Sequence, residues 1–179
     1  MRIANENHLH TKEKRWFAVY TKYKREKLVN KLLQEKDIEV YLPLQKFTRR
    51  WERKRRVVEL PFISCYIFVK ITKAEYVEVL STEHVLNFVK FSKNLISIPE
   101  AEIKLMQRVL GEGVEIQLEK QLLREGDMVE IMVGNLAGVK GRFIEEKGKQ
   151  EVVIELESLG YGMRMGIDPA ILEKLTVGA

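Results

Sequence analysis

Residues 62–71 read FISCYIFVKI, and with Leu60 and Pro61 before them they belong to the longest apolar stretch of the chain. That stretch, Leu60 to Val69, has about half of the roughly 20 residues that a membrane-spanning helix needs. β-branched and aromatic residues dominate it, which favours a strand over a helix. We therefore predict that residues 62–71 form the central strand of a sheet.

Two strands and a helix are expected before this stretch. Arg15–Thr21 alternates, with aromatic and β-branched side chains, and predicts a strand that is buried on both sides. Lys24–Lys36 places its leucines and a valine on one stripe with charged residues opposite, which is typical of an amphipathic helix. Ile38–Leu44 predicts a second strand, stopped or placed at a sheet edge by Pro43.

A strongly basic segment lies between this second strand and the central one. Residues 46–56, KFTRRWERKRR, contain seven basic residues and one acidic residue. Strand character resumes at Val57–Leu60. We therefore expect the basic run to form the tip of a β-hairpin.

Three further elements are expected after the central strand. They are a short helix at Lys73–Leu80, a strand at Val85–Phe91 and a helix at Pro99–Leu110. Ser97 is the expected N-cap of the last helix, and Pro99 lies near its first turn. The order β-α-β-β-β-α-β-α predicts an α+β fold, a ferredoxin-like α/β sandwich with a mostly antiparallel sheet.

Changes in composition and in apolar periodicity divide the chain into four parts. Residues 1–14 are polar and aperiodic and predict a flexible tail, and residues 15–110 form the sandwich domain. Residues 111–123 have two glycines and no clear period, so we expect a linker there. Residues 124–179 predict a small, strongly bent, SH3-like β-barrel. Its expected elements are strands at Met128–Val133, Gly141–Glu146, Glu151–Glu157 and Gly162–Gly166 and a last apolar turn at Ile171–Leu175.

Charge is distributed unevenly between the two halves of the chain. The net charge is +5, but residues 1–110 hold 23 basic and 13 acidic residues, whereas residues 111–179 hold 8 basic and 13 acidic residues. This asymmetry predicts a basic module that meets nucleic acid, joined to an acidic module with another partner. The alternative is a chance segregation of solvated surface charge.

Several classes of function are disfavoured by what the sequence lacks. No charged start followed by an apolar run marks a secretory signal, so we expect a soluble cytoplasmic protein with no membrane partner. Cys65 is the only cysteine, which leaves no internal disulfide and no CxxC zinc site. The histidines, His8, His10 and His84, indicate no metal or nucleophile constellation, and no phosphate-binding or hydrolase motif is present. We expect no enzyme, no metal and no cofactor.

Three patterns, in this order, resemble the NusG family of transcription elongation factors. Residues 16–21, WFAVYT, with the basic helix and the YLP of residues 41–43 after them, resemble the opening of that family's N-terminal domain. Residues 62–69, FISCYIFV, are similar to its central strand, usually F-P-G-Y-V-x-V, although ISC stands here where Pro-Gly is usual. Residues 125–141, EGDMVEIMVGNLAGVKG, resemble a KOW motif. The resemblance covers about residues 15–175.

The resemblance implies a polymerase-binding site on the N-terminal domain. In the family, an apolar depression receives the tip of the clamp helices of the largest subunit of RNA polymerase. By position it would involve Trp16, Phe62 and Tyr66, with Ile67 or Phe68 beneath. Aromatic residues in a concave site with a polar rim commonly anchor protein interfaces. We expect Tyr66 and Phe62 to be partly exposed; an ordinary core position is the alternative for each.

Two basic groups are the candidate contacts with nucleic acid. The hairpin combines phosphate-attracting charge with Trp51, which can stack on a base. The resemblance directs this face toward upstream DNA and the non-template strand of the transcription bubble; the alternative is a solvated charged loop. The second group lies at the start of the first helix, where backbone amides add to the attraction of anions. The candidate residues are Lys22, Lys24, Arg25, Arg49, Arg50, Trp51, Arg53, Lys54, Arg55 and Arg56.

The glycines of the KOW-like segment mark a fold and not a catalytic site. Gly134, Gly138 and Gly141 bracket a tight connection between strands, where positive φ or close backbone approach excludes a Cβ atom. Some KOW domains bind RNA, but this domain is acidic, and binding to phosphate requires lysines and arginines. We therefore expect a protein partner, such as a ribosomal protein or Rho, in preference to RNA.

The resemblance implies a monomeric transcription elongation and antitermination factor that binds RNA polymerase and suppresses pausing or termination. Its partners would be the polymerase clamp helices and non-template DNA or nascent RNA. The N-terminal extension, the ISC departure and the dense arginine hairpin favour a specialised paralogue of the UpxY or RfaH kind, acting on an operon such as one for polysaccharide biosynthesis. The alternatives are a housekeeping NusG that couples polymerase to Rho or the ribosome, a ribosome-associated KOW RNA-binding protein and a purely structural adaptor.

Overall fold

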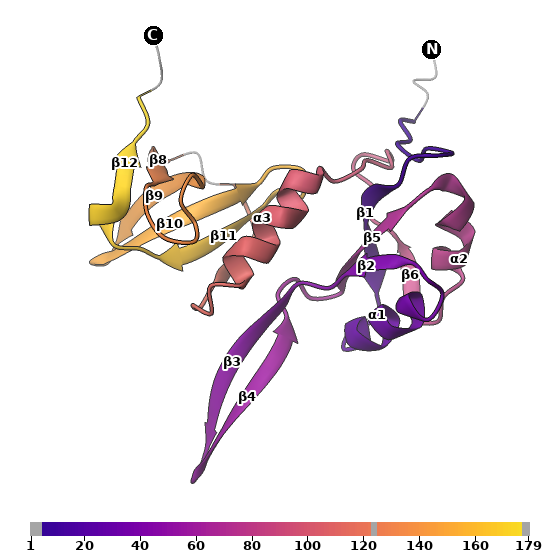
Figure 1. The fold of residues 1–179 in the computed structure, drawn as a ribbon, viewed down its shortest axis with the longest axis horizontal. Coiled ribbons are helices and arrows are strands. Elements are labelled where there is room, and N and C mark those ends of the chain that lie inside the picture. Colours follow the sequence, from indigo (N-terminus) through magenta and orange to yellow (C-terminus); the bar gives the residue numbers. More distant parts are fainter. Residues whose placement is uncertain (1–4, 123–124, 177–179) are drawn as a thin grey trace. The chain divides into compact units, whose positions relative to one another are not determined.

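The computed structural model describes residues 5–122 and 125–176 of the chain. The chain divides into two compact units, each described here by itself. One unit comprises Met1–Leu44 and Glu59–Ile103, and the other comprises Gln45–Val58 and Lys104–Ala179. Figure 1 shows a mixed sheet-and-helix region in the first part of the chain and a strand-rich region in its last part.

A four-stranded antiparallel sheet forms the centre of the first unit. Its strands are β1 (Arg15–Thr21), β2 (Glu39–Tyr41), β5 (Tyr66–Ile71) and β6 (Val85–Phe88), in the order β2-β5-β1-β6. The strand predicted from residues 62–71 is therefore central in the sheet, although it begins only at Tyr66. The prediction of an α+β sandwich is confirmed.

The helices follow the predicted order. They are α1 (Glu26–Gln34), the 3₁₀ turn η1 (Lys73–Glu75) with α2 (Tyr76–Leu80), and α3 (Glu100–Leu110). Alternation along β1 and β5 sends one set of side chains into a core shared with α1 and α2. This core contains Phe17, Val19, Val29, Leu33, Ile67, Val69, Ile71, Val79 and Phe88, all 2% exposed or less.

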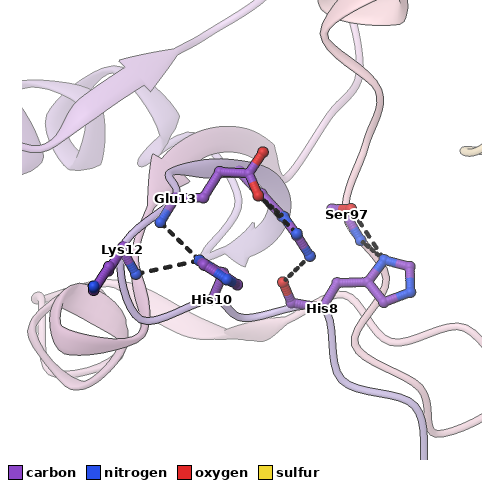
Figure 2. Close-up of polar contacts among 6 residues, drawn as sticks. His8, His10, Lys12, Glu13 and Ser97 are labelled. Carbon is purple, nitrogen blue, oxygen red and sulfur yellow. Dashed lines mark hydrogen bonds and ion pairs between the residues drawn. The ribbon is translucent and has the colours of Figure 1, made fainter.

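The described part of the expected flexible tail is held in place by hydrogen bonds. Glu6 and His8 bond the backbone of Leu95, and the backbone carbonyl of His10 accepts from the amide of Lys73 at 2.8 Å. Figure 2 shows the imidazoles of His8 and His10 receiving amide hydrogen bonds, His8 from Ser97 at 3.0 Å. A polar segment without apolar periodicity is ordered here by its own side chains.

Ser97 does not cap α3, contrary to the prediction. Its hydroxyl and its amide both contact Nδ1 of His8, each at 3.0 Å. Pro99 stands immediately before the helix, and its carbonyl accepts from the amide of Glu102 at 3.0 Å. The local capping rule is overridden because a residue distant in sequence supplies a partner for Ser97.

A tight turn replaces the predicted start of the central strand. Cys65 adopts a φ of 65°, a left-handed conformation that is unfavourable for a residue with a Cβ atom. Its amide donates to a carboxylate oxygen of Glu26 at 2.9 Å, and Glu26 is only 3% exposed. The first turn of α1 therefore holds the turn that leads into β5.

The basic segment forms a hairpin, as predicted, but with longer strands than expected. β3 (Leu44–Trp51) and β4 (Lys54–Pro61) make a separate two-stranded sheet, in which only Glu52 and Arg53 form the turn (Figure 1). Apart from Arg53 in the turn, the basic residues of the run thus lie on the strands themselves.

A six-stranded antiparallel sheet forms the strand-rich domain. Its order is β12 (Leu172–Lys174), β8 (Asp127–Ile131), β9 (Lys140–Glu146), β10 (Lys149–Leu156), β11 (Tyr161–Gly166) and β7 (Gln117–Glu119). The predicted strands are all present, and the 3₁₀ turn η2 (Pro169–Ile171) with β12 occupies the predicted last apolar turn.

The expected linker contributes a strand to this sheet. Gln117–Glu119 pairs with Gly162–Arg164 of β11. Arg164 holds the strand from the side: its guanidinium lies 3.6 Å from Glu119, 3.0 Å from Glu146 and 2.6 Å from Glu151. Hydrogen bonds to Glu146 and Glu151 raise the pKa of Arg164 above its ordinary value. The domain therefore begins before residue 124.

Gly141 and Gly138 serve different physical purposes in this domain. Gly138 adopts a φ of 85°, and Gly134 nearby has a φ of 83°. At Gly141 the constraint is space, because a Cβ atom would lie 2.7 Å from both the Val152 side chain and the carbonyl of Val153. The two predicted reasons for glycine, a positive φ and a close backbone approach, therefore both occur in this segment.

The bond between Glu26 and Cys65 gives a first testable prediction. Glu26→Ala leaves the Cys65 amide without its acceptor and should lower the free energy of unfolding by about 1–3 kcal/mol. Glu26→Gln retains a carbonyl oxygen at the same place and should cost clearly less. Urea unfolding followed by far-ultraviolet circular dichroism measures both variants. Equal losses would contradict a role for the acceptor.

Crowding at Gly141 gives a second prediction. Gly141→Ala should destabilise the domain by about 1–3 kcal/mol, because the added methyl group overlaps β10. Gly166→Ala is the matched control, since a Cβ atom there meets nothing within 4 Å. Hydrogen exchange of β9 and β10 amides, read by mass spectrometry, should accelerate in the first variant only. Equal exchange in the two variants would show that the sheet accommodates the added methyl group at residue 141 without a loss of stability.

Candidate functional site

The face of the first sheet opposite the helix-covered core carries a group of aromatic side chains. Alternation places Trp16, Ala18 and Tyr20 of β1 on this face. The β1–β5 register sets them opposite Lys70, Phe68 and Tyr66. We call these six residues, together with Tyr41 of β2, the aromatic face.

Two tyrosines form the accessible part of the aromatic face. The rings of Tyr20 and Tyr66 meet edge to face with centroids 5.0 Å apart, and their hydroxyls lie 3.3 Å from each other. Tyr20 is 37% exposed and Tyr66 is half-buried, as expected for Tyr66. Large, rigid rings with a polar tip are the side chains that commonly anchor protein interfaces.

Of the rest of the aromatic face, Trp16, Ala18 and Phe68 are buried, and Tyr41 and Lys70 are half-buried. Trp16 is 5% exposed; its indole N–H donates to Glu100 at 3.1 Å, and the ammonium of Lys70 lies 5.8 Å from its ring centroid. Lys70 also pairs with Glu100 at 3.1 Å. Tyr41 stacks on fully buried Phe68, and burial raises the pKa of the Tyr41 phenol, so that it stays neutral. These residues support the tyrosine pair.

Phe62 is less exposed than predicted, and of the two residues expected beneath the site, Phe68 and not Ile67 lies on the aromatic face. Ile67 is fully buried and belongs to the helix-covered core, because it alternates with Tyr66 and Phe68 along β5. Phe62, expected to be partly exposed, is 9% exposed, and its amide bonds the carbonyl of Pro43 at 2.9 Å.

Tyr20 is the residue of this surface that the candidate set omits. The signal for it was present, because Trp16, Ala18 and Tyr20 share one face of an alternating strand. Its pairing with Tyr66, by contrast, depends on the register between two strands far apart in sequence, which a single sequence does not provide.

The first basic group lies in the turn before α1, not within the helix. Lys22, Lys24 and Arg25 are all exposed, and Lys24 has a φ of 60°. Its ammonium lies 5.3 Å from the ring centroid of Tyr23. Beside this turn is a shallow groove of about 350 Å³, lined by Tyr23, Lys24, Glu26, Lys27, Glu59, Leu60, Pro61 and Ser64.

The second basic group occupies the outer part of the hairpin. Every residue from Thr48 to Val57 is exposed, and Trp51 is 76% exposed. This segment contains all the hairpin candidates, Arg49, Arg50, Trp51, Arg53, Lys54, Arg55 and Arg56. An exposed tryptophan among arginines provides both stacking area and charge for a nucleic acid.

The connection between β8 and β9 exposes two apolar side chains. Met132 is 47% and Val133 is 54% exposed, whereas Leu136 in the same connection is 5% exposed. The amide of Gly138 closes the loop by donating to the carbonyl of Ile131 at 2.8 Å. The loop thus presents Met132 and Val133 on a fixed backbone.

Two kinds of site are absent from the part of the chain that the structure describes. Within residues 5–122 and 125–176, no group of three or more His, Cys, Asp or Glu side chains could hold a metal ion. In the same part of the chain, no helix has the length and apolar character needed to cross a membrane.

Comparisons with known proteins agree with this architecture. The family model described as "Transcription termination factor nusG" matches residues 14–107. The chain resembles the solved structure titled "Domain interaction in Thermotoga maritima NusG" with a TM-score of 0.56 and 19% identity, covering 92% of this chain and 98% of that one. A structure titled "Crystal Structure of MjSpt4:Spt5 complex conformation A" aligns with a TM-score of 0.32 and 20% identity, over 90% and 98% of the two chains. No curated protein matches the chain. Because the family model covers more than half of the sequence, from β1 into α3, the chain belongs to the NusG family of transcription factors.

Proposed function

We propose that this protein is a transcription elongation and antitermination factor that docks on RNA polymerase through its aromatic face. The observation that carries the proposal is the pair of exposed Tyr20 and half-buried Tyr66 on a face that also contains buried Trp16 and Phe68. The partner would be the clamp helices of the largest polymerase subunit, as the family resemblance implies. The protein would act in the cytoplasm, as a monomer and without catalysis of its own.

The proposed effect on transcription is a population shift. A factor that binds the closed clamp more tightly than the open clamp disfavours paused and terminating states by the difference in binding free energy. A difference of about 1.4 kcal/mol changes such an equilibrium tenfold. No bond is made or broken by the factor, which agrees with a site built only of binding surfaces.

The basic residues would supply the second contact, to non-template DNA or nascent RNA. The exposed Lys22, Lys24 and Arg25 and the hairpin arginines support this assignment. We further propose a specialised paralogue acting on a particular operon, such as one for polysaccharide biosynthesis. The support is the N-terminal extension, which is hydrogen-bonded to the segment before α3, and the unusual turn at Cys65.

The strand-rich domain would bind a protein. Its sequence is acidic, and the loop carrying Met132 and Val133 presents apolar area of the kind that protein partners cover. A ribosomal protein or Rho would be the partner if the chain is a housekeeping NusG, which is the principal alternative. Tight, steeply salt-dependent RNA binding that survives neutralisation of both basic groups would instead favour a ribosome-associated RNA-binding protein.

The polymerase contact is tested by elongation assays with cognate bacterial RNA polymerase on a template with a known terminator. The protein should increase read-through, and Tyr66→Ala should abolish the increase. Loss of an anchoring aromatic residue costs about 2 kcal/mol of binding free energy, or roughly thirtyfold in affinity. Tyr66→Phe is the matched control, because it keeps the ring and removes only the hydroxyl.

Circular dichroism must show that both tyrosine variants are folded. Unchanged read-through in folded Tyr66→Ala would contradict docking through this face. A protein that neither binds polymerase nor changes read-through, with the leader sequence of the operon present, would refute the proposed function as a whole.

The nucleic-acid contact gives a separate prediction. Replacing Arg53, Lys54, Arg55 and Arg56 by glutamine should reduce read-through while polymerase binding through the aromatic face remains. The physical reason is the loss of four exposed positive charges that can displace counterions from phosphates. Co-sedimentation with polymerase and the read-through assay measure the two properties. Full read-through in this variant would identify the protein as a structural adaptor.

A further inference from the structure

A small polar pocket lies where the N-terminal extension, residues 5–14, meets the segment that follows β6. Its volume is about 200 Å³, which is room for roughly six water molecules. Whole cofactors and drug-sized molecules usually need about 300 Å³ or more, so the pocket suits a single small group. It lies within the first unit and is lined by Asn5, Glu6, Asn7, Tyr76, Lys90, Lys93 and Leu95.

Hydrogen bonds and a ring contact hold the sides of the pocket in place. The amide of Glu6 donates to Oδ1 of Asn94 at 2.8 Å, and the amide of Leu95 donates to the carbonyl of Glu6 at 2.9 Å. The ring of Tyr76 stacks on buried Phe88, with the two ring centroids 4.6 Å apart. A ligand therefore meets a site whose backbone is already ordered, which lowers the entropy cost of binding.

The pocket combines two positive charges with a further hydrogen-bond donor. Lys90 and Lys93 are exposed, and in the part of the chain that the structure describes neither ammonium group has an ion pair or a hydrogen bond. The hydroxyl of half-buried Tyr76 has no hydrogen bond to a described residue either. These three groups are available to a ligand.

Two acceptors of the pocket are already engaged within the extension. Oδ1 of Asn7 accepts from the amide of Leu9 at 2.9 Å, which leaves the Nδ2 group of Asn7 as a donor. An oxygen of the Glu6 carboxylate lies 2.6 Å from Nε2 of His8. The groups that remain for a ligand therefore favour an anion with several acceptor oxygens.

The backbone at Lys93 is strained. The amides of Phe91 and Asn94 each donate to the carbonyl of the other residue at 2.9 Å, so Ser92 and Lys93 form a two-residue loop. Their φ angles are 50° and 70°. Such loops strongly prefer asparagine followed by glycine, because both central residues need a positive φ. Strained backbone is concentrated at functional sites, and here the strain holds a lysine at the pocket where glycine would fit better.

We propose that this pocket binds the phosphate group of a small phosphorylated molecule, either a phosphate monoester or a diphosphate. A phosphate monoester carries close to two negative charges and three strong acceptor oxygens. The ammonium groups of Lys90 and Lys93 match the charge, and Tyr76 and Asn7 supply neutral donors. The inference goes beyond the proposed function and does not depend on it, because none of these residues belongs to the aromatic face.

The first experiment is a nuclear magnetic resonance titration of the ¹⁵N-labelled full-length chain. Sodium phosphate or sodium pyrophosphate replaces sodium chloride at constant ionic strength. Amide signals of residues 5–8 and 90–95 should shift and saturate, and they should shift more than those of the basic residues 22–25 and 49–56. Equal shifts in all basic segments, or the same shifts with sodium acetate, would show general screening of charge and overturn the inference.

The second experiment identifies which part of a ligand is recognised. Adenosine monophosphate should bind about as tightly as inorganic phosphate, and adenosine should not bind. Dimethyl phosphate has a single charge, like the backbone of a nucleic acid, and should bind at least about tenfold more weakly than the monoester. Equal binding of dimethyl phosphate would assign the pocket to a nucleic-acid backbone, and equal binding of adenosine would assign it to a base. Either result would overturn the inference.

The third experiment separates binding from folding. Lys93→Gly removes the ammonium group and relieves the strain, so this variant should unfold at the same temperature as the parent or higher while it loses about tenfold in affinity for pyrophosphate. Lys90→Gln should lose a similar factor. Lys12→Gln is the matched control, since Lys12 is exposed on the same extension but does not line the pocket. Parental affinity in Lys93→Gly, or equal losses in all three variants, would overturn the inference.

The fourth experiment uses the extension as a reporter. Because the pocket has residues from the extension on one side and Lys90 and Lys93 on the other, a bound anion should hold the two segments together. Hydrogen exchange of the amides of residues 6–8, read by mass spectrometry, should slow in pyrophosphate compared with chloride at equal ionic strength. Unchanged exchange at saturating pyrophosphate would show that the anion binds elsewhere.

Discussion

The pairing of β1 with β5 is the constraint on which the first unit depends. Its register sets Val19 opposite Ile67 on one face and Tyr20 opposite Tyr66 on the other. A slip of one residue would exchange the two faces, bringing tyrosine hydroxyls into the core and exposing valine and isoleucine. The turn at Cys65, held by Glu26, fixes where β5 begins and so protects this register. The interior and the binding surface are therefore specified by the same hydrogen bonds.

The sequence predicts most strands and helices because their periodicities are strong, and it fails where partners are distant. Ser97 matches a capping pattern but is engaged by His8, which lies near the other end of the domain. Residues 5–14 have no apolar period and are ordered by hydrogen bonds that composition does not show. β7 is different: Val114, Ile116 and Leu118 alternate, so the sequence contained a signal for a strand within the expected linker.

The candidate site, too, could be predicted where a local sequence pattern is sufficient, but not where residues far apart in the sequence meet. Which residues are basic and exposed could be predicted from the run KFTRRWERKRR, because such a segment cannot be buried. The sequence left Ile67 and Phe68 as alternatives beneath the site, and the alternation along β5 puts Ile67 in the helix-covered core, on the face opposite Tyr66. The pairing of Tyr20 with Tyr66 required the register between β1 and β5, which only the structure provides.

The position of β1 in its sheet has a consequence for biosynthesis. β1 is made early, yet both of its neighbours, β5 and β6, follow much later in the chain. Strands far apart in the sequence can pair only after the long loop between them has closed, which costs conformational entropy. The sheet is therefore expected to fold slowly compared with a helical domain of equal size. Until residue 71 has left the ribosome, the nascent chain displays an unpaired, aromatic β1, and one edge of β1 stays unpaired until β6 follows. A chaperone that shields extended apolar segments would therefore meet this protein before any partner of the folded sheet does.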